Sequence, residues 1–277
     1  TKTASLQERI TFEKDFHIQD VVFSYNNTNY NDVLTVNSKP RRYNIIFKES
    51  ESFSWLDEIN NVNNFLLIDK NVKKILNESS YKFNIPTYEI EATEDNKNIT
   101  KVLQVCEWFQ EHKVNRGSMV YVLGGGILQD IGAFSCYMFK RGVPWTFIPT
   151  TLLAQADSCL GAKTAVNFKD SKNVLGLFSA PRKVIVDTKF LETLNMNDTS
   201  SGIGEIFRLC ITGGWNSFNY LRSKSLMSDL DDLIKASLLV KKLIVDYDEY
   251  ELDIRRSMNY GHSIGHAIEA YTHYKIP

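Results

Sequence analysis

Residues 119–130 read MVYVLGGGILQD, and this stretch decides the fold. An apolar, β-branched run ends there in three glycines, 124–126. A buried strand that stops in this way leaves bare backbone N–H groups at the carboxyl edge of a sheet, and residues 131–134 (IGAF) predict the start of a helix. A strand, a glycine turn and a helix N-terminus together form a site for a pyrophosphate. The stretch has neither the G-x-G-x-x-G spacing nor the P-loop lysine, so a simple tight turn is the alternative.

The composition is typical of a soluble globular protein. The chain has 277 residues, of which 43% are hydrophobic and 23% are charged, enough for one large or two ordinary domains. A net charge of −1 gives no global field that would attract nucleic acid or an anionic membrane. No apolar run has the length of a bilayer span and residues 1–10 do not resemble a signal peptide, so we expect a cytoplasmic protein. Its four cysteines form no C-x-x-C pair, which predicts reduced, mostly buried thiols.

Strand and helix patterns alternate through the first 190 or so residues, which predicts a doubly wound, Rossmann-like α/β layer. Residues 1–38 are expected to supply an extra edge strand or an ordered arm. The predicted strands are 43–47, 65–69, 88–91, 119–124, 145–149 and 184–188. The predicted helices are 72–76, 131–139 and a helix from Glu94 to about His112 with Val102, Leu103, Cys106 and Phe109 on one face. Ligands of such layers bind at the carboxyl ends of the strands.

Two features at those strand ends allow either a functional or a structural interpretation. Asp69 ends a predicted strand, where an acid binds a ribose hydroxyl or caps the following helix. Residues 157–173 carry Asp157, Lys163, Lys172 and Asn173 among small residues. The lysines suit an anionic substrate, and an ordinary solvated loop is the alternative.

Strand signals stop near residue 195, where a polar cluster at 195–200 predicts a domain boundary. We therefore expect an α/β domain over 1–197 and a helical domain over 198–277, with helical patterns at 202–213, 226–247 and 254–271. Lys241 and Lys242 end an apolar helical run and are expected to be solvated unless that helix faces the cleft.

A polar stripe marks the last of these predicted helices. Arg255, Asn259, His262 and His266 are spaced i, i+4, i+7 and i+11, which places them within about 60° of arc on one helix face. Two histidines one turn apart can share a metal, or one can bind it while the other does acid–base work. Buried structural histidines are the alternative. Glu205 is either a partner for a helix dipole in a first turn or a metal ligand.

Taken together, these motifs resemble the dehydroquinate synthase family of sugar-phosphate cyclases. The resemblance covers residues 65–277. It is carried by GGGILQD (124–130), KRG (140–142), PTTLLAQADS (149–158), GAKTAVN (161–167), SKN (171–173), GIGEIFR (202–208) and NYGHSIGHAIE (259–269).

The resemblance implies a tightly held NAD, a divalent metal, usually zinc with cobalt as the other choice, and an anionic sugar-phosphate substrate in a homodimer. It implies Glu205 and His262 as metal ligands. The implied cofactor-binding residues are Asp69, Asn71, Glu94, Lys97, Gly124, Gly125, Gly126, Asp130, Thr150, Thr151, Lys163, Lys172 and Thr193. The implied substrate-binding and catalytic residues are Arg141, Asp157, Lys163, Lys172, Asn173, Arg208, Lys241, Arg255, Asn259 and His266.

The implied reaction begins with oxidation of a ring hydroxyl by NAD, assisted by the metal. The new ketone acidifies the neighbouring C–H bond, so that phosphate leaves, and in the family the departing phosphate is thought to help remove that proton. NADH then returns the hydride, the ring opens, and an intramolecular aldol step closes a carbocycle. Lysines and arginines hold phosphate and carboxylate, while His266 and Asn259 handle protons and orientation.

Three features depart from the family pattern. Gln129 stands where glycine is common, and its side chain is expected to crowd the cofactor or hydrogen-bond to it. Arg208 stands where lysine is usual, and its larger, forked head makes this exchange non-neutral. A third metal ligand, a histidine of a His-Gly pair, is expected about twelve residues after His266, past Pro277, so we expect the chain to be part of a longer protein.

Three functions are compatible with these features. The first is a cyclase, most simply 3-dehydroquinate synthase, or a relative that acts on sedoheptulose 7-phosphate or glucose 6-phosphate. The second is an NAD-dependent polyol or sugar-phosphate dehydrogenase, which would release NADH instead of recycling it. The third is a binding protein without catalysis, which the Arg208 change and the missing third ligand favour.

Overall fold

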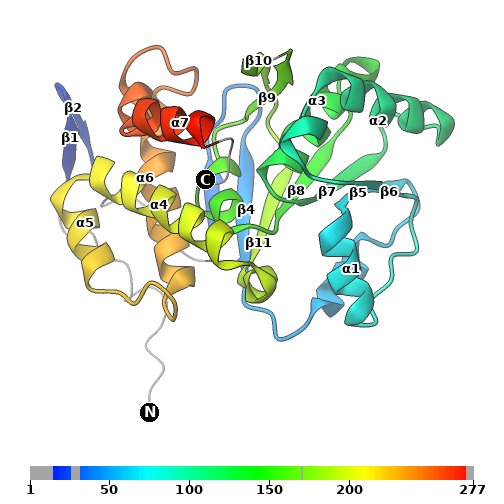
Figure 1. The fold of residues 1–277 in the computed structure, drawn as a ribbon, viewed down its shortest axis with the longest axis horizontal. Helices are drawn as coiled ribbons and strands as arrows, with labels where there is room; N and C mark the ends of the chain where they lie inside the picture. Colours follow the sequence, from blue (N-terminus) through cyan, green and yellow to red (C-terminus); the bar gives the residue numbers. More distant parts are fainter. Residues whose placement is uncertain (1–14, 26–31, 170, 273–277) are drawn as a thin grey trace.

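A seven-stranded sheet forms the centre of the molecule (Figure 1). The computed structural model describes residues 15–25, 32–169 and 171–272. The strand order is β3-β4-β11-β8-β7-β5-β6, and every pair is parallel except β3 with β4. The strands are β3 (Val33–Val36), β4 (Tyr43–Lys48), β5 (Asn64–Asp69), β6 (Thr87–Ile90), β7 (Met119–Gly124), β8 (Trp145–Pro149) and β11 (Lys183–Asp187). The predicted parallel layer is confirmed, and β3 is the edge strand expected from the first 38 residues.

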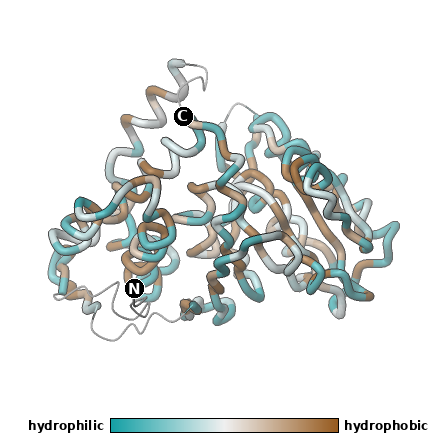
Figure 2. The backbone as a smooth tube through the Cα atoms, turned by 90° about the horizontal axis from the view of Figure 1, so that it is seen from below, coloured by the Kyte–Doolittle hydropathy of each residue, from teal (hydrophilic) through white to brown (hydrophobic). Residues whose placement is uncertain are grey.

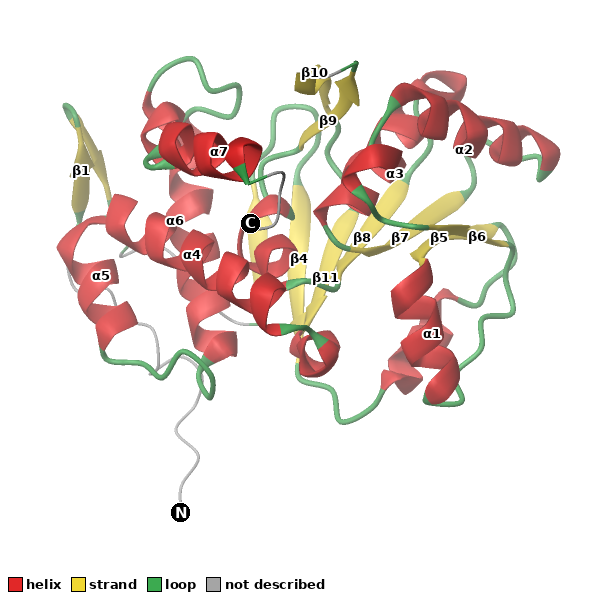
Figure 3. Ribbon diagram, viewed as in Figure 1, coloured by secondary structure: helices red, strands yellow, loops and turns green. Residues whose placement is uncertain are grey.

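Both faces of this sheet are buried, as the continuous apolar runs of its strands require. Alternate residues of one strand belong to different cores: Leu67 packs with Val122, while Leu66 and Ile68 pack on the other side with Leu123. Helices α2 (Ile99–Glu111) and α3 (Gly126–Met138) contribute to the first core, and α1 (Lys70–Glu78) contributes to the second. Figure 3 shows these helices in red on the two faces of the yellow strands. In Figure 2 the brown, apolar stretches run mainly through the interior.

Helix α3 begins at Gly126, five residues before the predicted start at Ile131. The glycines before it allow close packing against the segment that follows β8. A Cβ atom on Gly125 would lie 2.9 Å from Cγ2 of Thr151, closer than side chains tolerate. The chain can therefore turn directly from β7 into α3, and the helix N-terminus lies at the carboxyl edge of the sheet.

The predicted helix from Glu94 to His112 is interrupted. A 3-10 turn (Glu94–Asn96) precedes α2, whose N-cap Asn98 accepts a hydrogen bond from the backbone N–H of Lys101. Asparagine competes for backbone N–H groups and so begins a new helix instead of continuing an old one. The predicted apolar face was also wrong at Leu103, which is 49% exposed, while Cys106 is half-buried and Val105 and Trp108 join the core.

The unusual segment at 157–173 is neither an open loop nor part of the main sheet. A π-helical turn (Ala154–Ser158) leads into a two-stranded antiparallel hairpin, β9 (Lys163–Phe168) and β10 (Ser171–Phe178), as Figure 1 shows at the top of the molecule. Helix α3 packs against β9. All four cysteines have free thiols, and three of them are buried, as predicted.

The rest of the chain is helical. It contains α4 (Met196–Thr212), α5 (Gly214–Arg222), α6 (Leu230–Tyr247), the 3-10 turn η7 (Ile254–Asn259) and α7 (His262–Tyr271). Asn195, from the polar cluster predicted to be a boundary, caps α4 by accepting from the backbone N–H of Asp198. A small hairpin, β1 (Phe16–Ile18) and β2 (Val21–Phe23), packs on α5. In the parts of the chain that the structure describes, no helix is both long and apolar enough to cross a bilayer.

The predicted single helix over 254–271 was wrong. Arg255 and Asn259 lie in η7, whereas His262 begins α7, so the four polar residues do not form one stripe on one helix. The break is Gly261, whose φ of +83° is left-handed and favours glycine. The sequence signal for the break is therefore the glycine itself.

Candidate functional site

A cavity of about 810 Å³ lies where α3, the segment after β8, the β9–β10 hairpin, α4, α6 and η7 approach one another. It is open to solvent at the carboxyl edge of the sheet, the place where ligands of such layers bind. The predicted site residues that line it are Glu94, Lys97, Gly126, Asp130, Thr151, Asp157, Lys163, Asn173, Lys241 and Arg255. The structure therefore gathers residues from both halves of the chain around one space.

The N-terminus of α3 forms one wall of this cavity. Gly126 and Ile127 line it, and the N-cap Gly125 has no side chain that could bond the first N–H groups of the helix. Unsatisfied N–H groups and the helix dipole both favour an anion at such a place. Gly124 and Gly125 lie directly before this wall: Gly125 allows its close approach to Thr151, and Gly124 leaves room for Leu128.

Next to this wall, Lys97 joins two groups that the sequence predicted separately. Its Nζ atom lies 2.6 Å from Oδ2 of Asp130 and donates to Oδ1 of Asn173 over 2.7 Å. Burial raises the pKa of Asp130, and the neighbouring Lys97 opposes that rise. Lys172 lies 3.7 Å from the carboxylate of Glu94 at the same end. The cluster ties the hairpin to the start of α2 and α3.

Asp157 is the second charged centre of the cavity. Lys241 lies 2.6 Å from its Oδ1 atom, and Arg208 lies 3.1 Å from its Oδ2 atom. Burial opposes the charge of this carboxylate, but Lys241 and then Arg208 outweigh burial and hold the pKa of Asp157 below its usual value. Lys241 is only 6% exposed and lines the cavity, so the stated exception applies: α6 faces the cleft and Lys241 is not solvated. Lys242 instead pairs with Asp246 on the same helix.

Arg208 connects three parts of the chain. Besides Asp157, its guanidinium contacts the carboxylate of Glu205, with Nε donating to Oε2 over 2.6 Å, and it also donates to the backbone oxygen of Met258. A planar guanidinium with five N–H donors can make all of these bonds at once. Glu205 lies in the middle of α4, so its interpretation as a first-turn dipole partner was wrong.

A third ion pair spans the opposite side of the cavity and involves a residue that the sequence did not reveal. Lys163 of the hairpin pairs with Glu251, and Asn259 donates to the same carboxylate over 2.7 Å. Burial and then Arg255 lower the pKa of Lys163, although its hydrogen bond with Glu251 opposes them. Glu251 lies in an acidic turn before Arg255 and has a φ of +58°. The acidic turn was the only feature of the sequence that could have pointed to Glu251 as a residue of the site.

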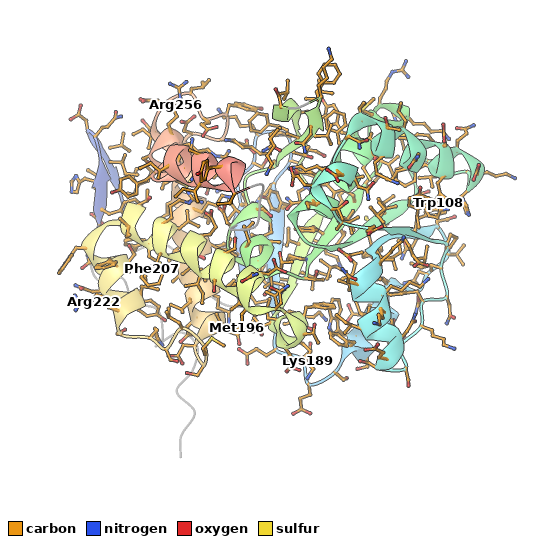
Figure 4. The ribbon with its side chains drawn as sticks, viewed as in Figure 1. Trp108, Lys189, Met196, Phe207, Arg222 and Arg256 are labelled. Atoms are coloured by element: carbon orange, nitrogen blue, oxygen red, sulfur yellow. The ribbon has the colours of Figure 1, made fainter. Side chains whose placement is uncertain are left out.

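Arg255 is 3% exposed and lies at the bottom of this side of the cavity. Its guanidinium donates to the backbone oxygens of Gly161 and Glu249. Its neighbour Arg256, labelled at the edge of Figure 4, is exposed. Burial, the largest influence, lowers the pKa of Arg255, and the nearby Glu251 and Asp157 oppose that effect.

Several predicted residues lie outside the cavity. Asp69 caps α1 by accepting from the backbone N–H of Asn71 over 2.7 Å, which confirms the helix-cap interpretation. Thr150 is buried behind the glycine turn, and Thr193 is exposed. Arg141 is exposed beyond the far end of α3, so the expectation that it joins this site is not met.

The histidines of α7 are only partly described. His262 is half-buried, and its charge helps to lower the pKa of Asp157. The side chain of His266 lies outside the described residues. Among the described residues, no group of three or more His, Cys, Asp or Glu side chains is placed to hold a metal ion. The structure thus offers two candidate donors, Glu205 and His262, and Arg208 is bound to the first.

A parallel α/β layer with a glycine turn, followed by a helical part that lines the same cavity, defines a two-part α/β fold class. Solved structures of both cyclases and dehydrogenases share this fold. Among solved structures, a 2-deoxy-scyllo-inosose synthase complexed with carbaglucose-6-phosphate, NAD+ and Co2+ has a TM-score of 0.74 at 24% identity, covering 88% of this chain and 72% of that one. An iron-containing alcohol dehydrogenase from Corynebacterium glutamicum has a TM-score of 0.56 at 15% identity, covering 89% and 70%. These likenesses support the fold.

The sequence comparisons are more specific. The 3-dehydroquinate synthase N-terminal model matches residues 87–201, and the C-terminal model matches residues 202–277. The 3-dehydroquinate synthase of Thermoanaerobacter pseudethanolicus is 37% identical over 261 residues, covering 88% of this chain and 73% of the relative. That of Pelagibacter ubique is 36% identical over 256 residues, covering 87% and 70%. The chain belongs to the 3-dehydroquinate synthase family.

Proposed function

We propose that the protein is an NAD- and metal-dependent 3-dehydroquinate synthase, which converts 3-deoxy-arabino-heptulosonate 7-phosphate to 3-dehydroquinate and phosphate. The observation that carries the proposal is the convergence of Lys97, Lys163, Lys241 and Arg255 on one cavity beside a helix N-terminus. A substrate with a phosphate and a carboxylate needs two separate groups of cations. Family membership makes this substrate the simplest choice.

The residues at the glycine turn fit a dinucleotide. The turn is too tight for a Cβ atom at Gly125, and the uncapped N-terminus of α3 faces the cavity, so a pyrophosphate can approach the backbone. NAD bound here would accept a hydride from the substrate and return it later. We assign the nicotinamide side to Asp130, Thr151, Lys163 and Lys172, and the adenosine half to Asn71, Glu94 and Lys97.

For the metal, we propose Glu205 and His262 as two ligands, because carboxylate and imidazole are the donors that zinc accepts. A divalent cation there would stabilise negative charge on a substrate oxygen. Arg208 bonds the carboxylate of Glu205, so a metal must compete with that ion pair. The assignment is tested by the zinc content of His262→Ala, which should fall while the thermal unfolding transition is retained.

The side chains of the cavity have separate tasks in this proposal. Lys163 and Asn259 share the carboxylate of Glu251, so an incoming substrate anion takes the place of that carboxylate. Lys241 and Arg255 lie on the helical side and hold the second anionic group, while Lys172 and Asn173 add further positive or polar contacts. Asn259 and His266 orient the reacting groups and handle protons.

Phosphate release tests the proposal. The full-length protein, supplied with NAD and zinc, is offered 3-deoxy-arabino-heptulosonate 7-phosphate and, separately, sedoheptulose 7-phosphate and glucose 6-phosphate. Phosphate release without net NADH identifies a cyclase, and the substrate that responds identifies its branch. Steady NADH formation without phosphate would contradict the proposal in favour of a dehydrogenase.

A second candidate, an NAD-binding homologue with impaired catalysis, is favoured by one observation: Arg208 holds the carboxylate that the metal would need. It predicts bound NAD with neither phosphate nor NADH formed from any of these substrates. A homodimer is a further prediction, which light scattering of the purified protein would check.

A further inference from the structure

Both ends of the Gln129 amide form hydrogen bonds with one residue of the cavity wall, Ser158. Gln129 lies in the second turn of α3, is 4% exposed and lines the cavity. Its Nε2 atom donates to the backbone oxygen of Ser158 over 2.8 Å, and Oγ of Ser158 donates to its Oε1 atom over 2.6 Å. Because both ends of the amide bond one residue, the orientation of the side chain is fixed.

Ser158 is the last residue of the turn Ala154–Ser158, and two further side chains, those of Gln155 and Ser237, anchor this turn on its other sides. Gln155 donates to the backbone oxygens of Pro149 and Asp187, over 3.0 and 2.9 Å, which ties the turn to the sheet. Ser237 of α6 donates to the backbone oxygen of Ala156 over 3.0 Å. Gln129 supplies the anchor toward α3, so the turn is held from three directions.

The residue that this turn presents to the cavity is Asp157, which directly precedes Ser158. Its carboxylate bonds Lys241 and Arg208, and its backbone oxygen also accepts from Lys241 over 2.7 Å. Any shift of Ser158 therefore moves the Asp157 oxygens to which Lys241 and Arg208 are bonded. A cation with a displaced partner no longer points to one position, and its affinity for an anion falls.

We propose that Gln129 is a positioning residue, whose amide fixes the turn Ala154–Ser158 and thereby sets Lys241 and Arg208 for an anionic substrate. The inference rests on the proposed function only for the identity of that anion. The amide is occupied by Ser158, so Gln129 acts through the turn and not as a ligand of the cofactor.

The first test measures the stability of the turn Ala154–Ser158 directly and does not depend on enzyme activity. Amide hydrogen–deuterium exchange in residues 154–158 is measured in the full-length protein and in Gln129→Ala. We expect about tenfold faster exchange, the value of one lost hydrogen bond. Gln110→Ala is the matched control, because Gln110 is an exposed glutamine of α2, and it should exchange at the wild-type rate. Unchanged exchange in Gln129→Ala would overturn the proposal.

Gln129→Glu separates hydrogen bonding from packing. The carboxylate has nearly the same shape and still accepts from Oγ of Ser158, but it cannot donate to the backbone oxygen. Faster exchange of residues 154–158 in this variant supports the bonding role, whereas wild-type exchange would show that only the volume of the side chain matters and would overturn the proposal.

The second test measures the affinities for inorganic phosphate and for NAD separately by calorimetry. In Gln129→Ala the Kd for phosphate should rise about tenfold, and the Kd for NAD should stay within twofold. Ser158→Ala should give a similar change, and the double variant should add little to either single one. If the Kd for NAD rose while the Kd for phosphate stayed unchanged, Gln129 would be a cofactor contact and the proposal would be rejected. Failure of the wild type to release phosphate would reject the proposed function alone, because neither test depends on catalysis.

Discussion

Oδ1 of Asp157 lies 2.6 Å from Nζ of Lys241, and this contact joins the π-helical turn after β8 to α6. The lysine is 6% exposed, so each partner depends on the other for its charge. Because the contact is both a structural tie and part of the candidate substrate site, its loss should be visible in stability as well as in binding.

Lys241→Met should lower the free energy of unfolding by roughly 3 kcal/mol, because Asp157 remains buried with Arg208 as its remaining cation. Urea denaturation monitored by circular dichroism measures the change. Lys242→Met serves as the control, since Lys242 pairs with Asp246 in a single i, i+4 contact on α6 and should cost less than 1 kcal/mol. Equal losses in the two variants would contradict the central role of the Asp157 pair.

The same pair predicts a pH dependence. The pKa of Asp157 is lower in the folded than in the unfolded chain, so its stabilising contribution is fully present above the unfolded pKa of about 3.9 and is lost as the pH falls through the folded value. The stability difference between wild type and Asp157→Asn should therefore be constant from pH 5 to 7 and shrink below about pH 4. Urea midpoints collected over this range test it, and a difference that grows on acidification would exclude the assigned direction.

Arg208→Lys should increase zinc affinity about tenfold, since one ammonium group cannot bond Glu205, Asp157 and the oxygen of Met258 at the same time. Competition with a chromogenic chelator gives the zinc Kd. Arg222→Lys on α5, labelled in Figure 4, provides an exposed control that should bind zinc as the wild type does. Weaker zinc binding by Arg208→Lys would indicate that the arginine supports Glu205 as a ligand instead of competing for it.

Glu251→Gln should strengthen the binding of inorganic phosphate several-fold, because it removes the negative charge that occupies Lys163 in the cavity. Isothermal calorimetry would measure the increase in phosphate affinity, and this increase should be smaller at the higher of two salt concentrations, because salt screens charge interactions. The matched variant is Glu89→Gln, whose partner Lys73 lies outside the cavity, and it should leave phosphate binding unchanged. A loss of phosphate affinity in Glu251→Gln would disprove that the Glu251 carboxylate and phosphate compete for Lys163.

Gly161→Ala should destabilise the protein by about 1–3 kcal/mol, because Gly161 has a φ of +112° and its missing Cβ leaves room for the guanidinium of Arg255. Gly204→Ala is the opposite case: Gly204 lies in α4 with open space around it, and the substitution should stabilise by roughly 0.5–1 kcal/mol. The melting temperature should fall in Gly161→Ala and rise in Gly204→Ala. A stabilised Gly161→Ala would refute the close approach.

The sheet was predictable because its strands carry their own local signal. Buried runs such as 65–69 and 119–124 end at polar or glycine residues, and both faces of the sheet are covered, as such runs require. The start of α3 was placed five residues late because glycines normally disfavour helix, whereas here Gly126 begins the helix directly after Gly125, which packs closely on Thr151 in the segment after β8.

The residue types of the site were predictable, but their pairing was not. Lys163 indicates an anion site by type and setting, and Lys241 enters only through the family resemblance, whereas their partners Glu251 and Asp157 follow from contacts between segments distant in sequence. The prediction of one polar stripe was wrong for a different reason. Helical periodicity holds only along a continuous helix, and the backbone turn at Gly261 interrupts the helix between Asn259 and His262.

Gly261 also has a consequence for how the site can diverge. The left-handed residue separates η7, with Arg255 and Asn259, from α7, with His262, so the direction of one segment does not dictate the direction of the other. Substitutions in the segment 248–259 can alter which anionic substituent is selected without rotating the imidazole of His262. Under the proposed function, a change of substrate can therefore be confined to residues before Gly261, while the proposed ligand His262 after it keeps its orientation.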